Sequence, residues 1–334
     1  MSGSAPLRVG VVGVGSLGFH HARILRDVEE VEHRGFFDID PARADTVARE
    51  LGLKAHSSLE SLLDEVDAVV VSVPTTDHES VALTGVQRGI HTLVEKPLAP
   101  SLEAADRILQ AAEATGAVVQ VGHVERFNPA VRAAAEYLDQ PLFVECHRMA
   151  PFVSRGTDVA VVLDLMIHDV DLVLSLVGTP IHEIAASGIP VLTPSVDIAN
   201  ARLNFTGGAV ANITASRISL DAMRKFRIWQ HSGYLSLDLA RGTGSFLRLK
   251  GDLPTLTGSD TPFASGNGLA DIVEMVPITG DGAEPLRREL ESFRDAALGR
   301  RTPVVSGEAG REALRVSLSI EERITRHVVD TSPA

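Results

Sequence analysis

The feature that most constrains this chain is a glycine-rich turn near its N-terminus, between an expected strand and an expected helix. Residues 7–12 form a short valine-rich run of the kind that makes a strand buried on both faces. The turn GVGSLG follows at residues 13–18 and leads into a helical pattern. The first glycine permits the tight turn, the second lets the backbone approach a pyrophosphate, and the third permits close packing of helix on strand. The pattern predicts a dinucleotide site at a helix N-terminus, formed by Gly13, Gly15, Ser16, Leu17 and Gly18.

Strand and helix patterns alternate through the first third of the chain. The expected strands are residues 7–12, 35–37, 68–73, 91–94 and 117–121, and the expected helices are 18–28, 41–51, 59–63, 78–88 and 102–115. Short connections between alternating strands and helices give parallel strands with right-handed crossovers. The pattern therefore predicts an α/β domain with a doubly wound parallel sheet over residues 6–122.

The pattern changes after residue 122. Two pairs of expected strands, 199–205 with 210–217 and 226–230 with 234–239, are each joined by a short turn and read as β-hairpins. The other expected elements are a strand at 143–149 and helices at 128–138, 159–176, 286–298 and 307–326. Hairpins imply antiparallel pairing, so residues 123–334 are predicted to form an α+β domain. Residues 251–285 are interpreted as an irregular surface excursion, and whether it closes over a site stays open.

Composition excludes several classes of protein. Acidic residues exceed basic ones, 44 against 31, so a general binder of nucleic acid or anionic membranes is not expected. The single cysteine, Cys146, can form neither an internal disulfide nor a cysteine-based zinc site. The longest apolar segment, 159–177, is interrupted by four ionisable residues, so no membrane span is expected. Without a secretory leader pattern, we expect a cytoplasmic protein.

An acidic residue follows the second expected strand. Asp38 lies 20 residues beyond Gly18, where a carboxylate would hold the adenine ribose hydroxyls. The same charge repels a 2′-phosphate, so NAD is favoured over NADP. Arg34 and Arg43 lie nearby and could weaken that preference, but we interpret them as solvated charges.

The ends of the third and fourth expected strands supply further candidates, because ligands of open α/β sheets lie beyond the carboxyl ends of the strands. Pro74, Thr75 and His78 are placed to line the cofactor, although His78 is equally well explained as capping its own helix. Glu95 and Lys96 lie beside the expected nicotinamide, and Pro97 forces a turn there. A partly desolvated lysine can transfer protons, whereas the ordinary alternative is a surface lysine.

A polar stripe marks the long expected helix at 159–176. Asp164 and His168 are four residues apart and therefore lie on one face among apolar neighbours. Taken alone, the pair is more simply a core histidine satisfied by a carboxylate one turn away. A metal site would need further ligands that the sequence does not place, so no metal is predicted.

Taken in order, these motifs resemble those of the Gfo/Idh/MocA oxidoreductases. The resemblance runs from Leu7 to the helix start near Gly307. It implies a Rossmann domain, a C-terminal α+β domain with a large, mostly antiparallel sheet, and hydride transfer between NAD or NADP and a sugar or polyol carbon. It also implies that Lys96 orients the reacting hydroxyl and moves its proton, that His168 is an acid/base, and that Asp164 holds a substrate hydroxyl or His168. A homodimer or homotetramer assembled through the C-terminal sheet is implied as well.

Two shorter stretches, 122–129 and 163–174, resemble the members of this family that oxidise C3 of UDP-N-acetylglucosamine with NAD⁺. This narrower resemblance places Arg126 near the cofactor and Asn128 near the substrate. A diphosphate needs local cations, and Arg217 is a candidate by its position. Two alternatives remain: a dehydrogenase of free polyols or monosaccharides, and a non-catalytic sensor that binds a dinucleotide.

Overall fold

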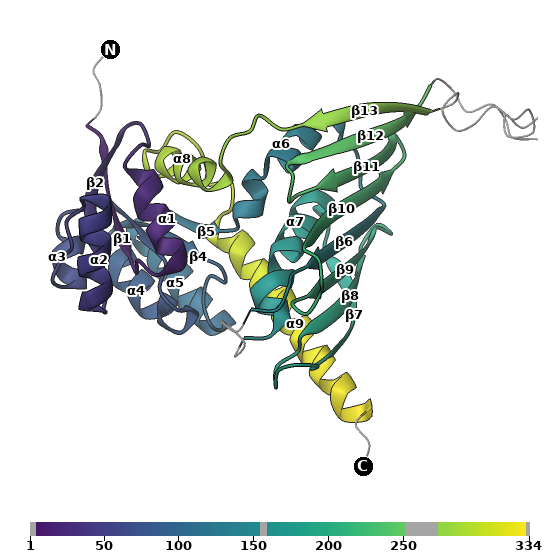
Figure 1. Ribbon diagram of the computed structural model, residues 1–334, viewed down its shortest axis with the longest axis horizontal. Helices are drawn as coiled ribbons and strands as arrows, with labels where there is room; N and C mark the ends of the chain where they lie inside the picture. Colours follow the sequence, from purple (N-terminus) through teal and green to yellow (C-terminus); the bar gives the residue numbers. More distant parts are fainter. Residues whose placement is uncertain (1–4, 154–158, 251–272, 332–334) are drawn as a thin grey trace, which may run out of the picture. The chain divides into compact units, whose positions relative to one another are not determined.

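The computed structural model describes residues 5–153, 159–250 and 273–331, and the chain forms two compact units (Figure 1). Unit 1 comprises Met1–Phe127 and Ala283–Val316, and unit 2 comprises Asn128–Gly282 and Ser317–Ala334. The sequence analysis divided the chain once, after residue 122. The structure instead returns the chain to unit 1 near its C-terminus, because residues 283–316 pack with the N-terminal sheet.

Unit 1 contains a five-stranded parallel sheet in the order β2-β1-β3-β4-β5, which confirms the predicted doubly wound sheet. Its strands are β1 (Leu7–Val12), β2 (Val31–Phe37), β3 (Ala68–Val71), β4 (His91–Glu95) and β5 (Val119–Gly122). Its helices are α1 (Ser16–Leu25), α2 (Pro41–Leu51), α3 (Leu59–Leu63), α4 (His78–Val86), α5 (Leu102–Thr115), α8 (Pro285–Ala297) and the first turns of α9 (Gly307–Thr331), with 3₁₀ turns η1 (Thr75–Asp77) and η2 (Val124–Phe127).

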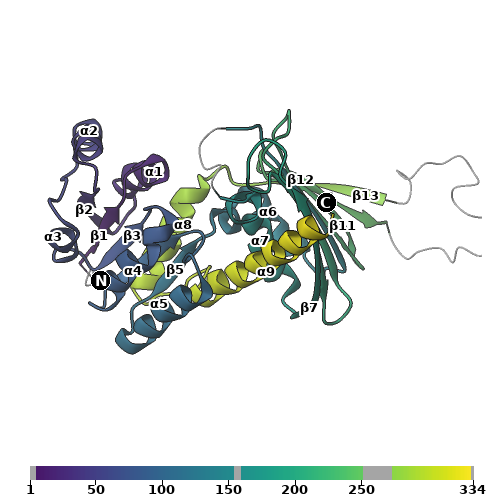
Figure 2. The same cartoon turned by 90° about the horizontal axis from the view of Figure 1, so that it is seen from below.

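The helices of unit 1 cover both faces of this sheet. Figure 2 shows α1, α2 and α8 on one face and α4 and α5 on the other. Leu25 of α1, Val47 of α2 and Phe293 of α8 share one buried core with strand residues such as Val11. The C-terminal helix α8 is therefore part of the core of unit 1.

Local sequence signals explain where several of these helices begin and end. Helix α2 begins with Pro41, and the side chain of Asp40 accepts hydrogen bonds from the backbone N–H groups of Ala42 and Arg43. The helix ends at Gly52, which adopts a left-handed conformation. These capping residues are why the sequence predicted the bounds of α2 correctly.

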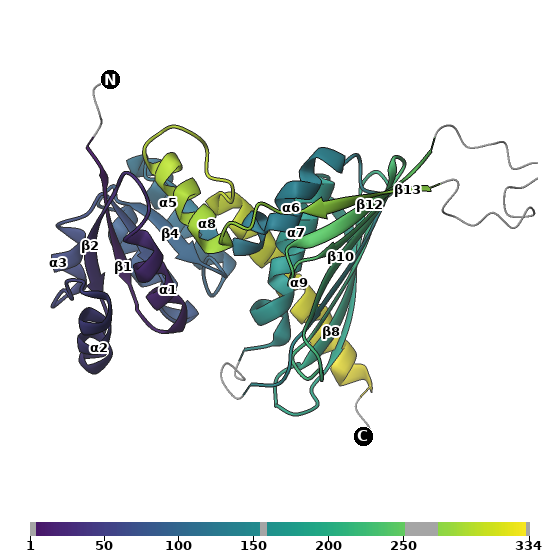
Figure 3. The same cartoon turned by 45° about the horizontal axis from the view of Figure 1, so that its top comes forward.

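Unit 2 contains an eight-stranded sheet in the order β13-β12-β11-β10-β6-β9-β8-β7 (Figure 1). Figure 3 shows the same sheet from a second direction, with α6 and α7 beside it. Every neighbouring pair is antiparallel except β6 with β9, which confirms the large, mostly antiparallel sheet. The strands are β6 (Phe143–Met149), β7 (Ile181–Ile189), β8 (Ile198–Phe205), β9 (Val210–Ser216), β10 (Met223–Gln230), β11 (Gly233–Asp238), β12 (Thr243–Leu249) and β13 (Val273–Thr279).

The helices expected at 128–138 and 159–176 in unit 2 are each divided into two elements. The helical elements of unit 2 are α6 (Pro129–Ala134), the 3₁₀ turn η3 (Ala135–Tyr137), the π-helical turn η4 (Val162–Met166) and α7 (Ile167–Val177), together with the last turns of α9. The single helix expected at 159–176 is thus two elements, η4 and α7, which pack against the sheet strands β6 and β9. Such π-helical turns are frequent at functional sites.

Part of the segment interpreted as irregular is in fact a strand. Residues 273–279 form the edge strand β13, which pairs with β12 and tolerates Pro277 because an edge strand needs fewer backbone donors. Residues 251–272, the larger part of the segment that was considered as a lid, lie outside the described part of the chain. Among the described residues, no helix has the length and apolar character that crossing a membrane requires.

Candidate cofactor and active site

The glycine turn has the geometry that a dinucleotide site needs. Gly13 has a φ of 81°, and a Cβ there would lie 2.6 Å from the carbonyl oxygen of Ser72. A Cβ at Gly18 would lie 1.9 Å from the carbonyl oxygen of Gly13. At Gly15, in contrast, a Cβ would meet no heavy atom within 4 Å. The protein's own packing therefore requires the first and third glycines, whereas the second faces open space.

A cavity of about 430 Å³ opens beside this turn in unit 1. It is lined by residues from the turn, from the ends of β2 and β3, and from α4. Gly13, Gly15, Asp38 and Pro74 are the predicted cofactor residues that line it. Its described lining includes the carboxylates Asp38 and Asp77 and contains neither Lys nor Arg. The cavity is therefore acidic at the position where a ribose would bind.

Asp38 is fixed at the mouth of the turn by the backbone. Its Oδ2 accepts a hydrogen bond of 2.7 Å from the N–H of Val14, and its Oδ1 accepts one of 2.9 Å from the N–H of Asp40. An ionised carboxylate has about four lone-pair sites, so acceptor capacity remains for hydroxyl groups. Its geometry fits a role in holding a ribose.

The two nearby arginines have defined partners, which differs from their interpretation as solvated charges. Arg43 donates from Nε to the carbonyl of Val14 at 2.7 Å and from Nη2 to that of Gly15 at 3.1 Å. Arg34 is paired with Glu32 and Glu65. Arg43 thus supports the glycine turn, a contact that the sequence gave no local reason to expect.

His78 connects the ends of two strands. Its Nδ1 lies 2.8 Å from the carbonyl oxygen of Pro97, and its Nε2 lies 3.0 Å from that of Val73. The ring is buried, and burial lowers its pKa below the ordinary value for histidine. The alternative that His78 caps its own helix is therefore wrong. Its contact with the cofactor stays a prediction.

Lys96 directly follows β4 and is half-buried. Its backbone N–H donates to Oε2 of Glu95 at 3.2 Å, while Oε1 of the same carboxylate lies 2.6 Å from Nε2 of His21. The residue that carries the candidate amine is thus attached to a buried His–Glu pair. The sequence pattern predicted the lysine but gave no sign of His21, which lies on α1, far from Lys96 in the chain.

The other two predicted catalytic residues belong to unit 2. Asp164 lies in the π-helical turn η4, His168 lies in the first turn of α7, and both are half-buried. The next residue, Asp169, forms a buried two-point ion pair with Arg148 of β6, at 2.9 and 2.8 Å. This pair attaches the start of α7 to the sheet and so fixes the backbone that carries His168.

The residues that the narrower resemblance singled out occupy different settings. Arg126 is half-buried in η2 of unit 1. Asn128 is buried in unit 2, where its Oδ1 caps α6 through the N–H of Ala130 and its Nδ2 donates to the carbonyl of Leu239 at 2.9 Å. Asn128 therefore has a structural task, and its contact with the substrate stays a prediction.

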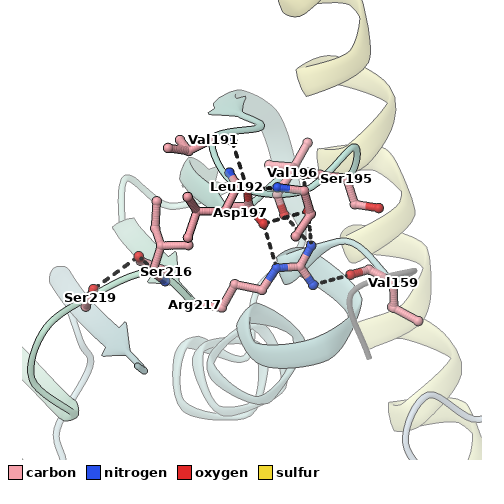
Figure 4. A network of polar contacts seen from close by, with 11 residues as sticks. Val159, Val191, Leu192, Ser195, Val196, Asp197, Ser216, Arg217 and Ser219 are labelled. Carbon is pink, nitrogen blue, oxygen red and sulfur yellow. Dashed lines mark hydrogen bonds and ion pairs between the residues drawn. The ribbon is translucent and has the colours of Figure 1, made fainter. Parts of the chain in front are cut away.

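Arg217 is part of an internal polar network of unit 2 (Figure 4). Its Nε donates to Oδ1 of Asp197 at 2.9 Å, its Nη1 to the carbonyl of Val159 at 2.5 Å, and its Nη2 to Oγ1 of Thr193 at 3.1 Å. The side chain is buried. Its role in binding a diphosphate stays a prediction, and these contacts show that the guanidinium already stabilises the fold.

Asp197 is the centre of that network. Burial alone would raise its pKa, but hydrogen bonds from the backbone N–H groups of Val191 and Thr193 and from Arg217 hold the pKa well below the ordinary value. The carboxylate therefore stays charged and holds the loop between β7 and β8. The sequence did not reveal this pair, because Asp197 directly precedes β8 and Arg217 directly follows β9.

One further group of side chains in unit 1 was not predicted. His21, Glu95 and Glu289 are buried, and their donor atoms all lie within 4.8 Å of one another. Within residues 5–153, 159–250 and 273–331, no other group of three or more such side chains meets that distance. By donor type it could hold a divalent cation, and it lies next to Lys96.

Comparisons with known proteins cover both units. The family described as "Oxidoreductase family, NAD-binding Rossmann fold" matches residues 7–123, and the GFO/IDH/MocA C-terminal domain matches residues 131–236. The chain is 35% identical over 320 residues to UDP-N-acetylglucosamine 3-dehydrogenase of Acidithiobacillus ferrooxidans, which covers 94% of this chain and 96% of that protein. It is 30% identical over 234 residues to scyllo-inositol 2-dehydrogenase (NAD(+)) of Bacillus subtilis, with 64% and 68% covered.

A solved structure agrees with these matches. A crystal form of the same Acidithiobacillus ferrooxidans enzyme superimposes with a TM-score of 0.86 at 33% sequence identity. The superposition covers 96% of this chain and 98% of that one. The similarity thus extends over nearly all of both chains.

Proposed function

Because the chain belongs to the Gfo/Idh/MocA oxidoreductase family, we propose that it oxidises C3 of a UDP-N-acetyl-sugar, with UDP-N-acetylglucosamine as the expected substrate. The observation that carries this proposal is the 35% identity to a UDP-N-acetylglucosamine 3-dehydrogenase over 94% of the chain. The chain is a nicotinamide-dependent dehydrogenase of a sugar or polyol, as the family and its relatives establish.

The proposed reaction removes a hydride from C3 and a proton from the hydroxyl group that C3 carries. When bound, NAD⁺ supplies the acceptor for the hydride that leaves C3 with its electron pair. Lys96 orients the C3 hydroxyl, and Lys96 and His168 together accept the proton that this hydroxyl loses. Asp164 holds a neighbouring substrate hydroxyl or His168. The products are a 3-keto sugar, NADH and one proton. In this proposal Asn128 contacts the substrate, and Arg126, Glu95, Thr75 and His78 lie along the cofactor.

We propose NAD rather than NADP as the cofactor. The support is the acidic lining of the cavity, where Asp38 and Asp77 would repel a 2′-phosphate. The remaining acceptor capacity of Asp38 suits the two ribose hydroxyls of NAD.

Asp38→Asn should shift the cofactor preference. The change keeps a side-chain oxygen for the N–H of Val14 but removes the charge that repels a 2′-phosphate. We expect the ratio of kcat/KM for NAD⁺ to that for NADP⁺ to fall by about 10- to 100-fold, since hydrogen bonds to charged groups contribute about 1.5–3 kcal/mol. Asp40→Asn is the matched control, because Asp40 caps α2 and does not line the cavity. An unchanged ratio in Asp38→Asn would contradict the assignment.

The substrate proposal is tested by incubating the protein with NAD⁺ and a panel of UDP-sugars while NADH is followed at its absorbance band. UDP-N-acetylglucosamine should generate NADH, and mass spectrometry should show a product lighter by two hydrogen atoms. No NADH with any UDP-sugar, together with turnover of free inositol or glucose, would overturn the proposal.

A free polyol is the second candidate, favoured by the 30% identity to the scyllo-inositol enzyme over 64% of the chain. UDP alone separates the two candidates. A ligand that binds the native state raises the melting temperature, so UDP should raise it for a nucleotide-sugar enzyme and leave it unchanged for a polyol dehydrogenase.

We further propose that the protein is cytoplasmic and assembles as a homodimer or homotetramer through its large sheet. On β10 the residues Phe226 and Ile228 are buried, whereas Met223 and Trp229 on the opposite face are exposed. Trp229 stacks near Tyr234 of β11, with ring centroids 4.8 Å apart. The same face carries Lys225 and Arg227, which pair with Asp238 and Glu145. Such a mixture of exposed apolar and charged side chains is typical of protein–protein interfaces and supports self-association. Light scattering of the purified protein tests it, and a monomer at micromolar concentration would contradict it.

A further inference from the structure

Three buried side chains meet beneath Lys96, although they come from distant parts of unit 1. His21 lies on α1, Glu95 ends β4, and Glu289 lies on α8. His21 and Glu289 have no exposed surface, and Glu95 is 7% exposed. Two carboxyl groups are therefore buried together with a single imidazole, which is costly unless charge and hydrogen bonds are balanced.

The Glu95 carboxylate connects this cluster to the backbone of Lys96. Its Oε1 lies 2.6 Å from Nε2 of His21, and its Oε2 accepts from the N–H of Lys96 at 3.2 Å. Gly122 leaves room for the same carboxylate, since a Cβ there would lie 2.8 Å from Oε2. The orientation of Glu95 is thus coupled directly to the position of the Lys96 backbone.

Glu289 faces Glu95 with both of its oxygens lacking a hydrogen-bond partner among the described residues. Burial, together with the nearby charge of Glu95, raises the pKa of Glu289 well above the ordinary value. In the protonated form a carboxyl group is uncharged and gains one O–H donor. Its backbone is held in place by Gln120, whose Nε2 donates to the Glu289 carbonyl at 3.1 Å.

The distance between His21 and Glu95 fits a hydrogen bond between the two side chains better than joint binding of a metal ion. Two ligands on a tetrahedral zinc at about 2.0–2.1 Å would be separated by roughly 3.3 Å. The His21 and Glu95 atoms are 2.6 Å apart, which is a hydrogen-bond distance. The Glu289 oxygen lies within 4.8 Å of both, a gap that a side-chain rotation or a single water molecule can bridge.

We propose that Glu289 is a positioning residue for Lys96. As an uncharged acid it donates a hydrogen bond to the Glu95 carboxylate, directly or through one water, and so holds the Glu95–His21 pair and the Lys96 backbone in one arrangement. This inference rests on the proposed role of Lys96 in the reaction.

The test compares two substitutions of similar volume. Glu289→Gln keeps an uncharged donor and should retain kcat within about threefold, whereas Glu289→Leu removes the donor and should lower kcat by about tenfold or more, with the KM for NAD⁺ nearly unchanged. The matched controls are Glu291→Gln and Glu291→Leu, because Glu291 lies on the same helix and pairs with Arg288 outside the cluster. Both control variants should keep the wild-type kcat.

Three outcomes would overturn the inference. The first is a Glu289→Leu variant that turns over like wild type. The second is a Glu289→Gln variant that keeps the wild-type melting temperature but loses turnover, a result that needs no folded leucine variant. The third is one equivalent of a transition metal in the purified protein that Glu289→Gln releases. Lys96→Ala, assayed in parallel, separates the two proposals: if it retains turnover, the proposed role of Lys96 fails whatever Glu289 does.

Discussion

Lys96→Ala should lower kcat by about 10²- to 10⁴-fold, the range that a positioned proton-transfer group contributes. The side chain lies at the end of β4 and does not line the cavity beside the glycine turn. We therefore expect the Kd for NAD⁺ to stay close to the wild-type value. Steady-state kinetics with the UDP-sugar substrate measure the first quantity, and calorimetric titration with NAD⁺ measures the second.

Lys54→Ala is the matched control for this prediction. Lys54 is an exposed lysine of the same unit, and its partner is Glu65 on the surface. An exposed ion pair contributes little to stability because water and salt screen it, so turnover and folding should both persist. Normal turnover by Lys96→Ala would show that another group moves the proton.

The second large effect is expected from Gly18→Ala, which should destabilise unit 1. The new Cβ would lie 1.9 Å from the carbonyl oxygen of Gly13, and backbone atoms cannot yield as a flexible side chain does. We expect the free energy of unfolding to fall by about 3 kcal/mol or more, the upper range for overpacking. Thermal or urea unfolding followed by circular dichroism measures the loss.

Gly15→Ala is the informative partner of that variant. A Cβ at this position meets no protein atom within 4 Å, so the melting temperature should stay near the wild-type value. The methyl group would occupy the space in which the backbone approaches a pyrophosphate, and the Kd for NAD⁺ should rise by about tenfold or more, equivalent to roughly 1.4 kcal/mol. If Gly15→Ala bound NAD⁺ as tightly as wild type, the pyrophosphate would not lie at this turn.

The elements that the sequence predicted well are helices with capping residues at both ends. Helix α2 has an N-cap, a first-turn proline and a terminal glycine, and α5 lies between Ser101 and Gly116 in the same manner. Strands β7, β12 and β13 were missed, because their patterns are weak and a strand depends on neighbours that are distant in sequence. The parallel pairing of β6 with β9 inside an antiparallel sheet was missed for the same reason.

The candidate site likewise contains residues that a local motif predicts and residues whose contacts depend on the fold. Gly13 and Gly18 belong to one contiguous motif, and their geometry matches the reasons given for them. Asp38 lies 20 residues further along the chain and accepts a hydrogen bond from the N–H of Val14, while its contact with a ribose stays a prediction. Asn128 was assigned to the substrate through resemblance and Arg217 by its position, yet both make internal hydrogen bonds. Asn128 also caps α6 locally, but Leu239 and Asp197 are brought close only by the fold of unit 2, so no local pattern could have revealed those two contacts.

The return of α8 to the first unit has a consequence for biosynthesis. Leu290 and Phe293 fill the same core as Val9 and Phe36, which leave the ribosome more than 200 residues earlier. Helices α1 and α2 cover part of this face of the sheet early, but the part that α8 covers stays exposed until almost the whole chain has been translated. A fragment that stops at residue 127 would expose that part to solvent and invite aggregation, whereas a circular permutant that places residues 283–316 ahead of residue 7 would supply the missing cover first.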